Sequence, residues 1–294
     1  MRAIVGAVVL VIALEVAHAA PGASTATRFI VFSAQPNGLG PGQLFRVETT
    51  GTGLEQITTG SKPASEPAFS PDGTQIVFAR LGSGIFRVNL DGTGLHRLTS
   101  GVRDNYPVMS PNGKLIVFIR VYRTQWRVYV MSAGGGTQRR LPQAPPAGRP
   151  SWTANGKSIL IPAGGSLAKI NSVTGDVQKY FGVTLDPSTS QTATVSPGAG
   201  TVAFVGRRVI KGPPTCGESQ CPAFALYLAD VSGAHKRLVA NDTGPAGWSP
   251  DGKTLVFVSR GALTLEVVAG GARTTIASGP HVAAGDAPPA WQPR

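Results

Sequence analysis

Residues 247–254, GWSPDGKT, have the spacing of a phosphate-binding loop, in which two glycines are followed by a lysine and a hydroxyl residue. In such a loop the phosphates lie on the amides that open a helix, so a helix must follow the lysine. The residues after Lys253 include instead the run Leu255–Val258, whose β-branched members favour a strand. The Pro-Asp-Gly triplet within the same stretch favours a tight turn. The sequence therefore predicts a hairpin here and no nucleotide site.

Side chains that could support catalysis are sparse. Only His96, His235 and His281 follow residue 19, and we expect the first two to lie in solvent on outermost strands. The sequence has no G-x-S-x-G elbow and no tight grouping of His, Asp and Glu. We therefore expect no catalytic residue, no metal site and no cofactor. A polysaccharide lyase is the enzyme alternative.

Arginines recur just past apolar runs, and other basic and aromatic residues occur in the neighbouring loops. If these loops share one face of the fold, the side chains would form a basic rim with aromatic rings between the cations. The alternative is that they are ordinary solubilising charges at strand ends. The predicted partner-binding residues are Arg80, Arg103, Arg120, Arg123, Trp126, Arg149, Arg207, Arg208 and Arg260.

The elements that would position these residues come from an internal repeat. A hydroxyl residue before a turn marks each copy, as in PAFSPDGTQIVFAR from Pro67 and PVMSPNGKLIVFIR from Pro107. The markers are separated by 40, 43, 43, 53 and 43 residues, a period typical of β-propeller blades. They are Ser70, Ser110, Thr153, Ser196, Ser249 and, in the sixth place, Gln292.

A second glycine-bearing turn recurs between the markers, as in NLDGTGLHRLT from Asn89, so each repeat holds two hairpins. In the repeat marked by Ser70 we expect strands at 66–70, 75–80, 84–89 and 95–99. The chain ends in PAWQPR, the first part of a repeat, and TRFIVFSA from Thr27 resembles the second strand of one. We therefore predict an all-β, six-bladed propeller of four-stranded antiparallel blades over 28–294, with the N- and C-terminal strands sharing one blade.

The first nineteen residues have the features of a secretory signal peptide. Arg2 precedes the apolar run Ile4–Leu14, and the small residues Ala17 and Ala19 follow it. We predict a signal peptide at 1–19, a linker at 20–27, and a periplasmic or extracellular protein with no transmembrane segment after cleavage. In that compartment Cys216 and Cys221 are expected to form a disulfide.

Several of these features together resemble the propeller of TolB, the periplasmic protein of the Tol-Pal envelope system. They are the S-P-D-G turn with an aromatic before it, the I-V-F strand, the R-L-T strand and the terminal A-W-Q-P. TolB has an α/β domain ahead of its propeller, whereas only 20–27 lie between the predicted cleavage site and the first strand here. Similar repeats occur in prolyl oligopeptidase-type peptidases and oligogalacturonate lyases, so the resemblance implies the fold and leaves the function open.

The net charge of +12 favours anionic partners. We expect a monomeric, non-enzymatic scaffold that binds an acidic protein at the cell envelope through loops at one mouth of the channel. The alternative is a carbohydrate-acting protein, either a lectin or a lyase of an acidic oligosaccharide. Nucleic acid is not an expected partner, because export separates the protein from it.

Overall fold

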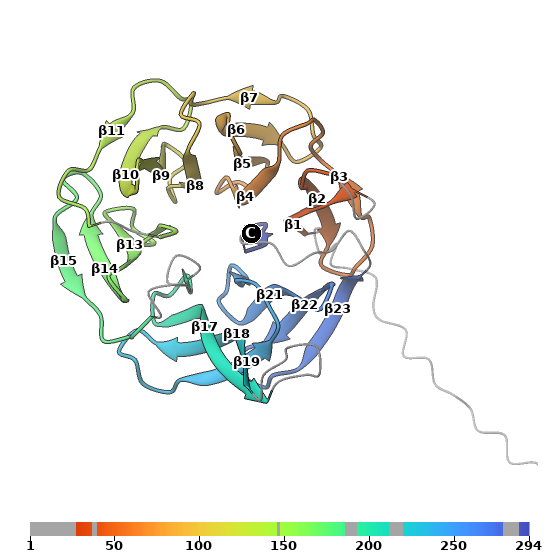
Figure 1. Cartoon of the computed structure of the whole chain (residues 1–294). Coiled ribbons are helices and arrows are strands. Elements are labelled where there is room, and N and C mark those ends of the chain that lie inside the picture. Colours follow the sequence, from red (N-terminus) through yellow and green to blue (C-terminus); the bar gives the residue numbers. More distant parts are fainter. Residues whose placement is uncertain are drawn as a thin grey trace, which may run out of the picture.

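The computed structural model describes residues 28–36, 40–145, 148–185, 193–211, 220–278 and 288–293. Six four-stranded antiparallel sheets surround a central axis (Figure 1). The predicted all-β, six-bladed propeller is confirmed, including the blade that both chain ends share. The predicted signal peptide, Cys216 and His281 lie outside the described residues, as does the side chain of Cys221, so the disulfide stays a prediction.

The blades are named A to F, and their strands are given from the innermost outward. Blade A holds β24 (Ala290–Trp291), β1 (Phe29–Ala34), β2 (Gln43–Glu48) and β3 (Glu55–Gln56). Blade B holds β4 (Ala64–Phe69), β5 (Gln75–Arg80), β6 (Gly84–Asn89) and β7 (His96–Arg97). Blade C holds β8 (Asp104–Met109), β9 (Leu115–Tyr122), β10 (Gln125–Ser132) and β11 (Arg139–Arg140).

The remaining blades follow the same order. Blade D holds β12 (Ser151–Trp152), β13 (Ser158–Ala163), β14 (Ser166–Asn171) and β15 (Val177–Tyr180). Blade E holds β16 (Thr194–Val195), β17 (Thr201–Lys211), β18 (Gln220–Asp230) and β19 (Arg237–Asn241). Blade F holds β20 (Gly247–Trp248), β21 (Thr254–Ser259), β22 (Ala262–Val267) and β23 (Arg273–Ser278).

The core lies between neighbouring blades, because each sheet is covered on both faces. The second strand of a blade is a run of β-branched and aromatic residues that is buried on both sides, as in β5 and β13. Phe78 of blade B, for example, packs in one cluster with Val31 and Leu44 of blade A. This burial on both faces explains the continuous apolar run that follows the turn in these repeats.

The recurring S-P-D-G turn is built by its own side chains. In blade B the Ser70 hydroxyl lies 2.5 Å from a carboxylate oxygen of Asp72 and accepts a hydrogen bond from the Gln75 amide. Gly73 has a φ of 70°, which glycine adopts without strain. Ser249 and Asp251 make the same contact in blade F, and β21 follows the turn. The stretch that resembled a phosphate-binding loop is therefore a hairpin.

The ring closes where β24 pairs with β1, through Ile30 with Trp291 and Val31 with Ala290. The side-chain oxygen of Gln292 accepts a hydrogen bond from the Phe29 amide, and its side-chain nitrogen donates to the carbonyl of Gly73 in blade B. Gln292 thus replaces the hydroxyl residue of the other repeats and links blade A to its neighbour.

The strands predicted in blade B differ little from those observed. β5 and β6 have the predicted bounds, β4 begins two residues earlier, and β7 has two residues where five were expected. His96 lies on the outermost strand β7 as predicted, but His235 lies in the turn before β19, not on the strand, with a φ of 53°. Both side chains are exposed.

In the described part of the chain no helix is long and apolar enough to cross a membrane.

Candidate functional site

One end of the central channel gathers two kinds of loop. Because the blades are antiparallel meanders, the segment before each innermost strand and the hairpin between the second and third strands lie at the same end. The S-P-D-G turns lie at the opposite end. We call the first end the channel mouth.

Three blades place different polar side chains at one repeat position on the channel mouth. Glu66, Tyr106 and Arg149 each precede the proline that begins the apolar part of an innermost strand, in blades B, C and D. Glu66 and Tyr106 lie at β-bulges, with φ values of 59° and 54°. A bulge redirects its side chain away from the regular strand. We call these three residues the mouth trio.

The mouth trio is connected across three blades. The carboxylate of Glu66 accepts a hydrogen bond from the Tyr106 amide at 2.5 Å. The Arg149 side chain crosses from blade D to blade B, where its Nη2 donates to the carbonyl of Pro67 at 3.2 Å. Arg149 is only 8% exposed, and its Nη1 has no hydrogen-bond partner among the described residues. Burial lowers the pKa of the Arg149 guanidinium, and the nearby charge of Glu66 opposes that shift.

Below the mouth trio lies a cavity of about 340 Å³ between the innermost strands. Arg149 lines it, together with the indole rings of Trp152, Trp248 and Trp291. The Nε1 atoms of Trp152 and Trp248 donate to backbone carbonyls of the preceding blades, at Val108 and Thr194. The Nε1 of Trp291 is buried and has no such partner in the described structure. The cavity is therefore lined mainly by apolar residues, and the unpartnered donors of Arg149 and Trp291 are buried within the protein.

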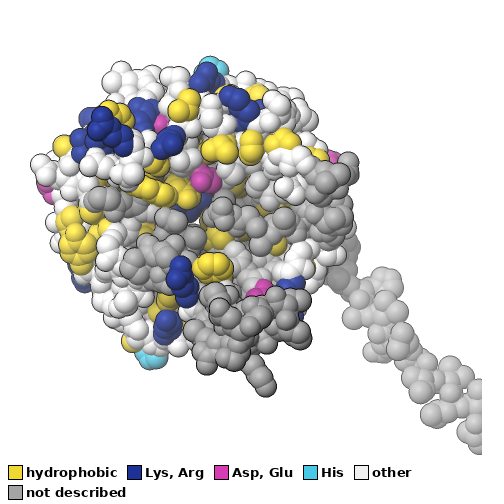
Figure 2. All heavy atoms as spheres, viewed as in Figure 1, with side chains coloured by type: hydrophobic (Ala, Val, Ile, Leu, Met, Phe, Trp, Pro, Cys, Tyr) yellow, Lys and Arg dark blue, Asp and Glu magenta, His cyan; other side chains and the backbone are white. Residues whose placement is uncertain are grey.

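A basic and aromatic patch extends outward from the mouth trio along blade C. Trp126 stacks on Tyr106 with ring centroids 5.8 Å apart. The guanidinium of Arg127 lies 4.7 Å from the ring centre of Tyr122, and that of Arg123 lies 5.7 Å from it. Figure 2 shows Lys and Arg side chains gathered over blade C. We call Arg103, Tyr122, Arg123, Trp126 and Arg127 the blade C patch.

The cations of the blade C patch are not neutralised within the described structure. None of Arg103, Arg123 and Arg127 takes part in an ion pair among the described residues. The Nη1 of Arg103 donates to the carbonyl of Arg123, which fixes one loop against the other. Tyr122, which lies close to the guanidiniums of Arg123 and Arg127, is 52% exposed. The patch can therefore attract and hold an anionic surface.

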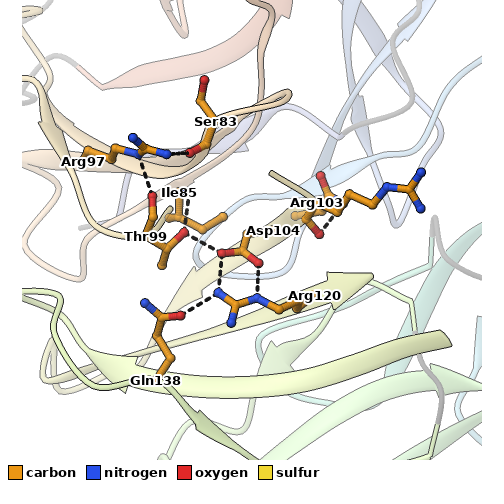
Figure 3. Close-up of polar contacts among 9 residues, drawn as sticks. Ser83, Ile85, Arg97, Thr99, Arg103, Asp104, Arg120 and Gln138 are labelled. Carbon is orange, nitrogen blue, oxygen red and sulfur yellow. Dashed lines mark hydrogen bonds and ion pairs between the residues drawn. The ribbon is translucent and has the colours of Figure 1, made fainter. Parts of the chain in front are cut away.

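Arg120 belongs to a different, internal network at the border of blades B and C (Figure 3). Its guanidinium makes two hydrogen bonds to the buried carboxylate of Asp104, at 2.6 and 2.7 Å, and a third to Gln138. Asp104 also accepts from the Thr99 hydroxyl of blade B. The hydrogen bonds to Asp104 and its negative charge raise the pKa of Arg120, and burial opposes that shift. Figure 3 shows the Arg103 side chain directed away from this network.

Arg80 occupies the same repeat position as Arg120 but lacks the carboxylate. Ala64 stands opposite Arg80 in the strand register, where Asp104 stands opposite Arg120. The Arg80 guanidinium lies over the rings of Phe78 and Phe86 and donates to the carbonyl of Thr59. Its Nε and Nη2 are buried without partners in the described residues, and burial lowers its pKa.

The remaining predicted site residues lie on blades E and F. Arg260 is 75% exposed and forms an ion pair with Asp242 at 3.2 Å. Arg207 is exposed on β17, opposite Phe224 of β18. Arg208 follows on β17, and its side chain lies outside the described part of the structure.

The structure thus groups four of the predicted residues, Arg103, Arg123, Trp126 and Arg149, around the mouth of blades C and D. Glu66 and Arg127 were not among the site residues predicted from the sequence. Glu66 could have been found from its place before the proline of an innermost strand, which it shares with Tyr106 and Arg149. Across the described ranges no group of three or more His, Cys, Asp and Glu side chains could hold a metal ion.

Comparisons with known proteins agree with this fold. The family model of the TolB beta propeller domain matches residues 16–156. The crystal structure of TolB from Acinetobacter baumannii has a TM-score of 0.71 at 18% identity, over 91% of this chain and 67% of that one. The putative TolB from Agrobacterium tumefaciens gives 0.56 at 15% identity, over 85% and 88%.

A third similar structure is an oligogalacturonate lyase in complex with manganese, with a TM-score of 0.52 at 15% identity, over 85% of this chain and 74% of that one. No curated protein sequence matches the chain. At these identities the structural matches establish a shared fold alone.

Proposed function

Because this chain is a TolB-like six-bladed β-propeller, we propose that it is an exported, non-enzymatic scaffold that binds an acidic protein at the cell envelope. The contact surface in this proposal is the channel mouth together with the blade C patch beside it. The propeller acts as a rigid frame, and recognition belongs to the loops that it holds in place.

The observation that supports this proposal most directly is the set of uncompensated cations in the blade C patch. Other arginines link neighbouring blades. Arg46 of blade A donates to the carbonyl of Leu90 in blade B, and Arg87 of blade B donates to the carbonyl of Ala133 in blade C. Arg103, Arg123 and Arg127 make no comparable link between blades in the described structure. Cations of one sign at a concave mouth raise the rate at which an acidic partner associates.

The aromatic rings of the patch support a protein partner in a second way. Trp126 and Tyr106 stack on each other, so their conformations are restricted before any partner arrives. Tyr, Trp and Arg are the residues that contribute most binding energy in protein interfaces. A surface that combines these types with a fixed geometry loses little side-chain entropy on binding.

An acidic oligosaccharide is the second candidate ligand, and one observation favours it. Tyr122 is half exposed, and two guanidiniums lie close to its ring. Guanidinium groups can hold the carboxylates of uronic acids through paired hydrogen bonds, and the ring offers a flat apolar surface beside them. Incubation with polygalacturonate tests this candidate: saturable binding without products supports a lectin, and ultraviolet absorbance of an unsaturated product supports a lyase.

The test of the proposed function compares two triple variants with the same change in charge. R103Q/R123Q/R127Q removes the cations of the blade C patch. K114Q/K157Q/K253Q removes three exposed cations of the S-P-D-G-type turns, at the opposite end of the blades. Envelope proteins retained by the wild-type protein are identified by mass spectrometry, and association with the purified partner is then measured at low and high salt.

We expect the patch variant to associate at least about tenfold more slowly, with a weaker dependence on salt, because steering by surface charge is screened by ions. The control variant should change the rate less than about twofold. If both variants slow association equally, the effect comes from net charge and not from the blade C patch. If neither variant changes the rate, the blade C patch is not part of the interface.

A further inference from the structure

A pocket of about 290 Å³ lies between blades B and C, at the end of the blades opposite the channel mouth. The S-P-D-G-type turns of both blades line it, and Arg87 reaches it from β6, the third strand of blade B. Met109, Pro71 and Pro111 supply apolar wall. The volume is near the lower limit for small-molecule sites, so the pocket suits a small ligand.

Comparison of neighbouring repeats shows what Arg87 lacks. In blade A the equivalent residue, Arg46, forms an ion pair with Glu55 at 2.5 Å. The residue opposite Arg87 in the strand register is His96, which stands where blade A has the glutamate. Blade B therefore keeps the guanidinium of this repeat position and lacks the carboxylate that pairs with it.

The guanidinium of Arg87 is open to solvent. Its Nη1 donates to the carbonyl of Ala133 at 3.4 Å, whereas its Nε and Nη2 donate to no described residue and are not fully buried. In blade A the ring of Phe29 lies 5.0 Å from the guanidinium carbon of Arg46, and Gln75 takes the place of that ring in blade B. Water hydrates such donors in the free protein, and a ligand carboxylate can replace it with stronger hydrogen bonds.

Asp72 supplies the opposite charge to the same pocket. Its Oδ1 accepts from the Ser70 hydroxyl and from the amide and hydroxyl of Thr74, whereas its Oδ2 accepts from no described residue. These hydrogen bonds lower the pKa of Asp72, so the carboxylate is ionised at neutral pH. No ion pair within the described ranges includes Asp72 or Arg87. The pocket thus presents one cation and one carboxylate that are not paired with each other.

We propose that this pocket binds a small zwitterion, a molecule with one carboxylate and one ammonium group. Its carboxylate accepts hydrogen bonds from Arg87, in the role that Glu55 has in blade A. Its ammonium group donates to Asp72, and an apolar side chain packs against Met109. Free amino acids and short peptides with both ends free have this chemistry. The inference does not rest on the proposed function, because the pocket and the channel mouth lie at opposite ends of the blades.

The experiment uses the full mature protein and four forms of leucine. Leucine carries both charges, N-acetylleucine only the carboxylate, leucinamide only the ammonium group, and N-acetylleucinamide neither. Each is titrated at about pH 6.5, where an α-amino group is protonated, while the methyl signals of ¹³C-labelled methionines are followed by NMR. Of the three methionines in the sequence, Met109 lines the pocket, and the buried Met131 serves as the internal reference.

We expect leucine to shift the Met109 signal saturably and more than that of Met131. Leucine should bind at least about tenfold more tightly than any form that lacks a charge, since hydrogen bonds to charged groups are the stronger ones. A form with one charge leaves either Arg87 or Asp72 without its partner. If N-acetylleucine or leucinamide binds as tightly as leucine, the pocket does not recognise a zwitterion and the proposal fails.

The variants separate the two contacts, after a thermal melt has shown that each is folded. Arg87→Gln should remove the preference for the carboxylate, and Asp72→Asn the preference for the ammonium group. His96→Glu rebuilds the ion pair of blade A within blade B and should weaken leucine binding at least about tenfold. Arg46→Gln, the matched control in blade A, should change it less than about twofold. Unchanged binding in Arg87→Gln or His96→Glu, or an equal loss in Arg46→Gln, would overturn the proposal.

Glycylleucine, whose two charges are further apart, identifies the source of the zwitterion. Tighter binding of leucine indicates a free amino acid, and tighter binding of glycylleucine indicates a short peptide; either result supports the proposal. The comparison of charged and blocked forms is then made with the tighter ligand. If neither leucine nor glycylleucine binds to the wild-type protein, the proposal is refuted, whatever the variants do.

Discussion

Replacement of Gly247 by alanine tests the closure of the ring. Gly247 begins β20, the innermost strand of blade F, next to the chain that leads into β24. A Cβ atom at this position would lie 1.9 Å from the carbonyl oxygen of Pro289. Gly247 was the first glycine of the apparent phosphate-binding loop, and the structure gives a different reason for a glycine at this position. The backbones at Gly247 and Pro289 approach each other too closely to leave room for a side chain.

The expected cost follows from the displacement that alanine requires. A Cβ atom essentially never lies within 3.0 Å of such an atom, so Pro289 and Gly247 must separate by about 1.1 Å. Overpacking of this kind costs about 1–3 kcal/mol. β24 is held to β1 by two residue pairs and by two hydrogen bonds of Gln292, whose amide donates to the carbonyl of Phe29 and whose side-chain oxygen accepts from the Phe29 amide. Loss of one or two of these hydrogen bonds would add about 1 kcal/mol each. We expect a total loss of about 2–5 kcal/mol.

The measurement is equilibrium unfolding in urea, with Gly198→Ala as the matched control. Gly198 lies in the turn of blade E, where an added Cβ would meet no atom within 4 Å, so its replacement should change the free energy of unfolding by less than about 0.5 kcal/mol. Hydrogen exchange of Gln292 should accelerate in Gly247→Ala, because local opening of the seam becomes easier. If the two variants unfold at the same urea concentration, the close approach of blades F and A does not exist.

Three further predictions concern the turns and the internal network. Asp104→Ala leaves Arg120 without its buried carboxylate and should lower the free energy of unfolding in urea by about 3 kcal/mol; an unchanged midpoint would contradict the network. The hydrogen bond from Ser70 and those from the following residues lower the pKa of Asp72 below its usual 3.8, so the stability that this carboxylate contributes is present above that pH and is lost as the pH falls through the lowered pKa. Thermal melts of Asp72→Asn and wild type should therefore differ at neutral pH and converge once the pH falls below that lowered pKa, and a constant difference would refute the assignment. Ala199→Gly should raise the free energy of unfolding in urea by about 0.5–1 kcal/mol, since Ala199 has a φ of 54° where glycine is unstrained; a lower free energy of unfolding would show that this turn is not strained.

The architecture could be predicted from the sequence because its determinants are local and repeated. In the turns of blades B, C, D and F the hydroxyl residue bonds to an acidic or amide residue two positions later and to an amide five residues later, as Ser70 does with Asp72 and Gln75. The second strand is buried on both faces, so its β-branched run is continuous. Both signals lie within one repeat and recur at a fixed period, and six copies require a closed ring.

The outer strands were the least predictable part of the fold. β7 and β11 have two residues each, with exposed side chains, so no buried pattern marks where they begin and end. His235 was placed on a strand for the same reason, although it lies in the turn before β19. A short strand at the rim is defined by its hydrogen bonds to one neighbour, which composition does not reveal.

The sequence by itself determined that this protein is a six-bladed β-propeller, that its ends share a blade, and which repeat positions face the channel mouth. Only the tertiary structure decided which arginines remain available there. Arg80 and Arg120 are equivalent in the repeat, yet one faces Ala64 and the other the carboxylate of Asp104. Arg149 is buried because it crosses to a blade 82 residues away in the chain. A repeat shows which positions are equivalent, but the pairing of charges depends on strand register and on neighbours brought together when the ring closes.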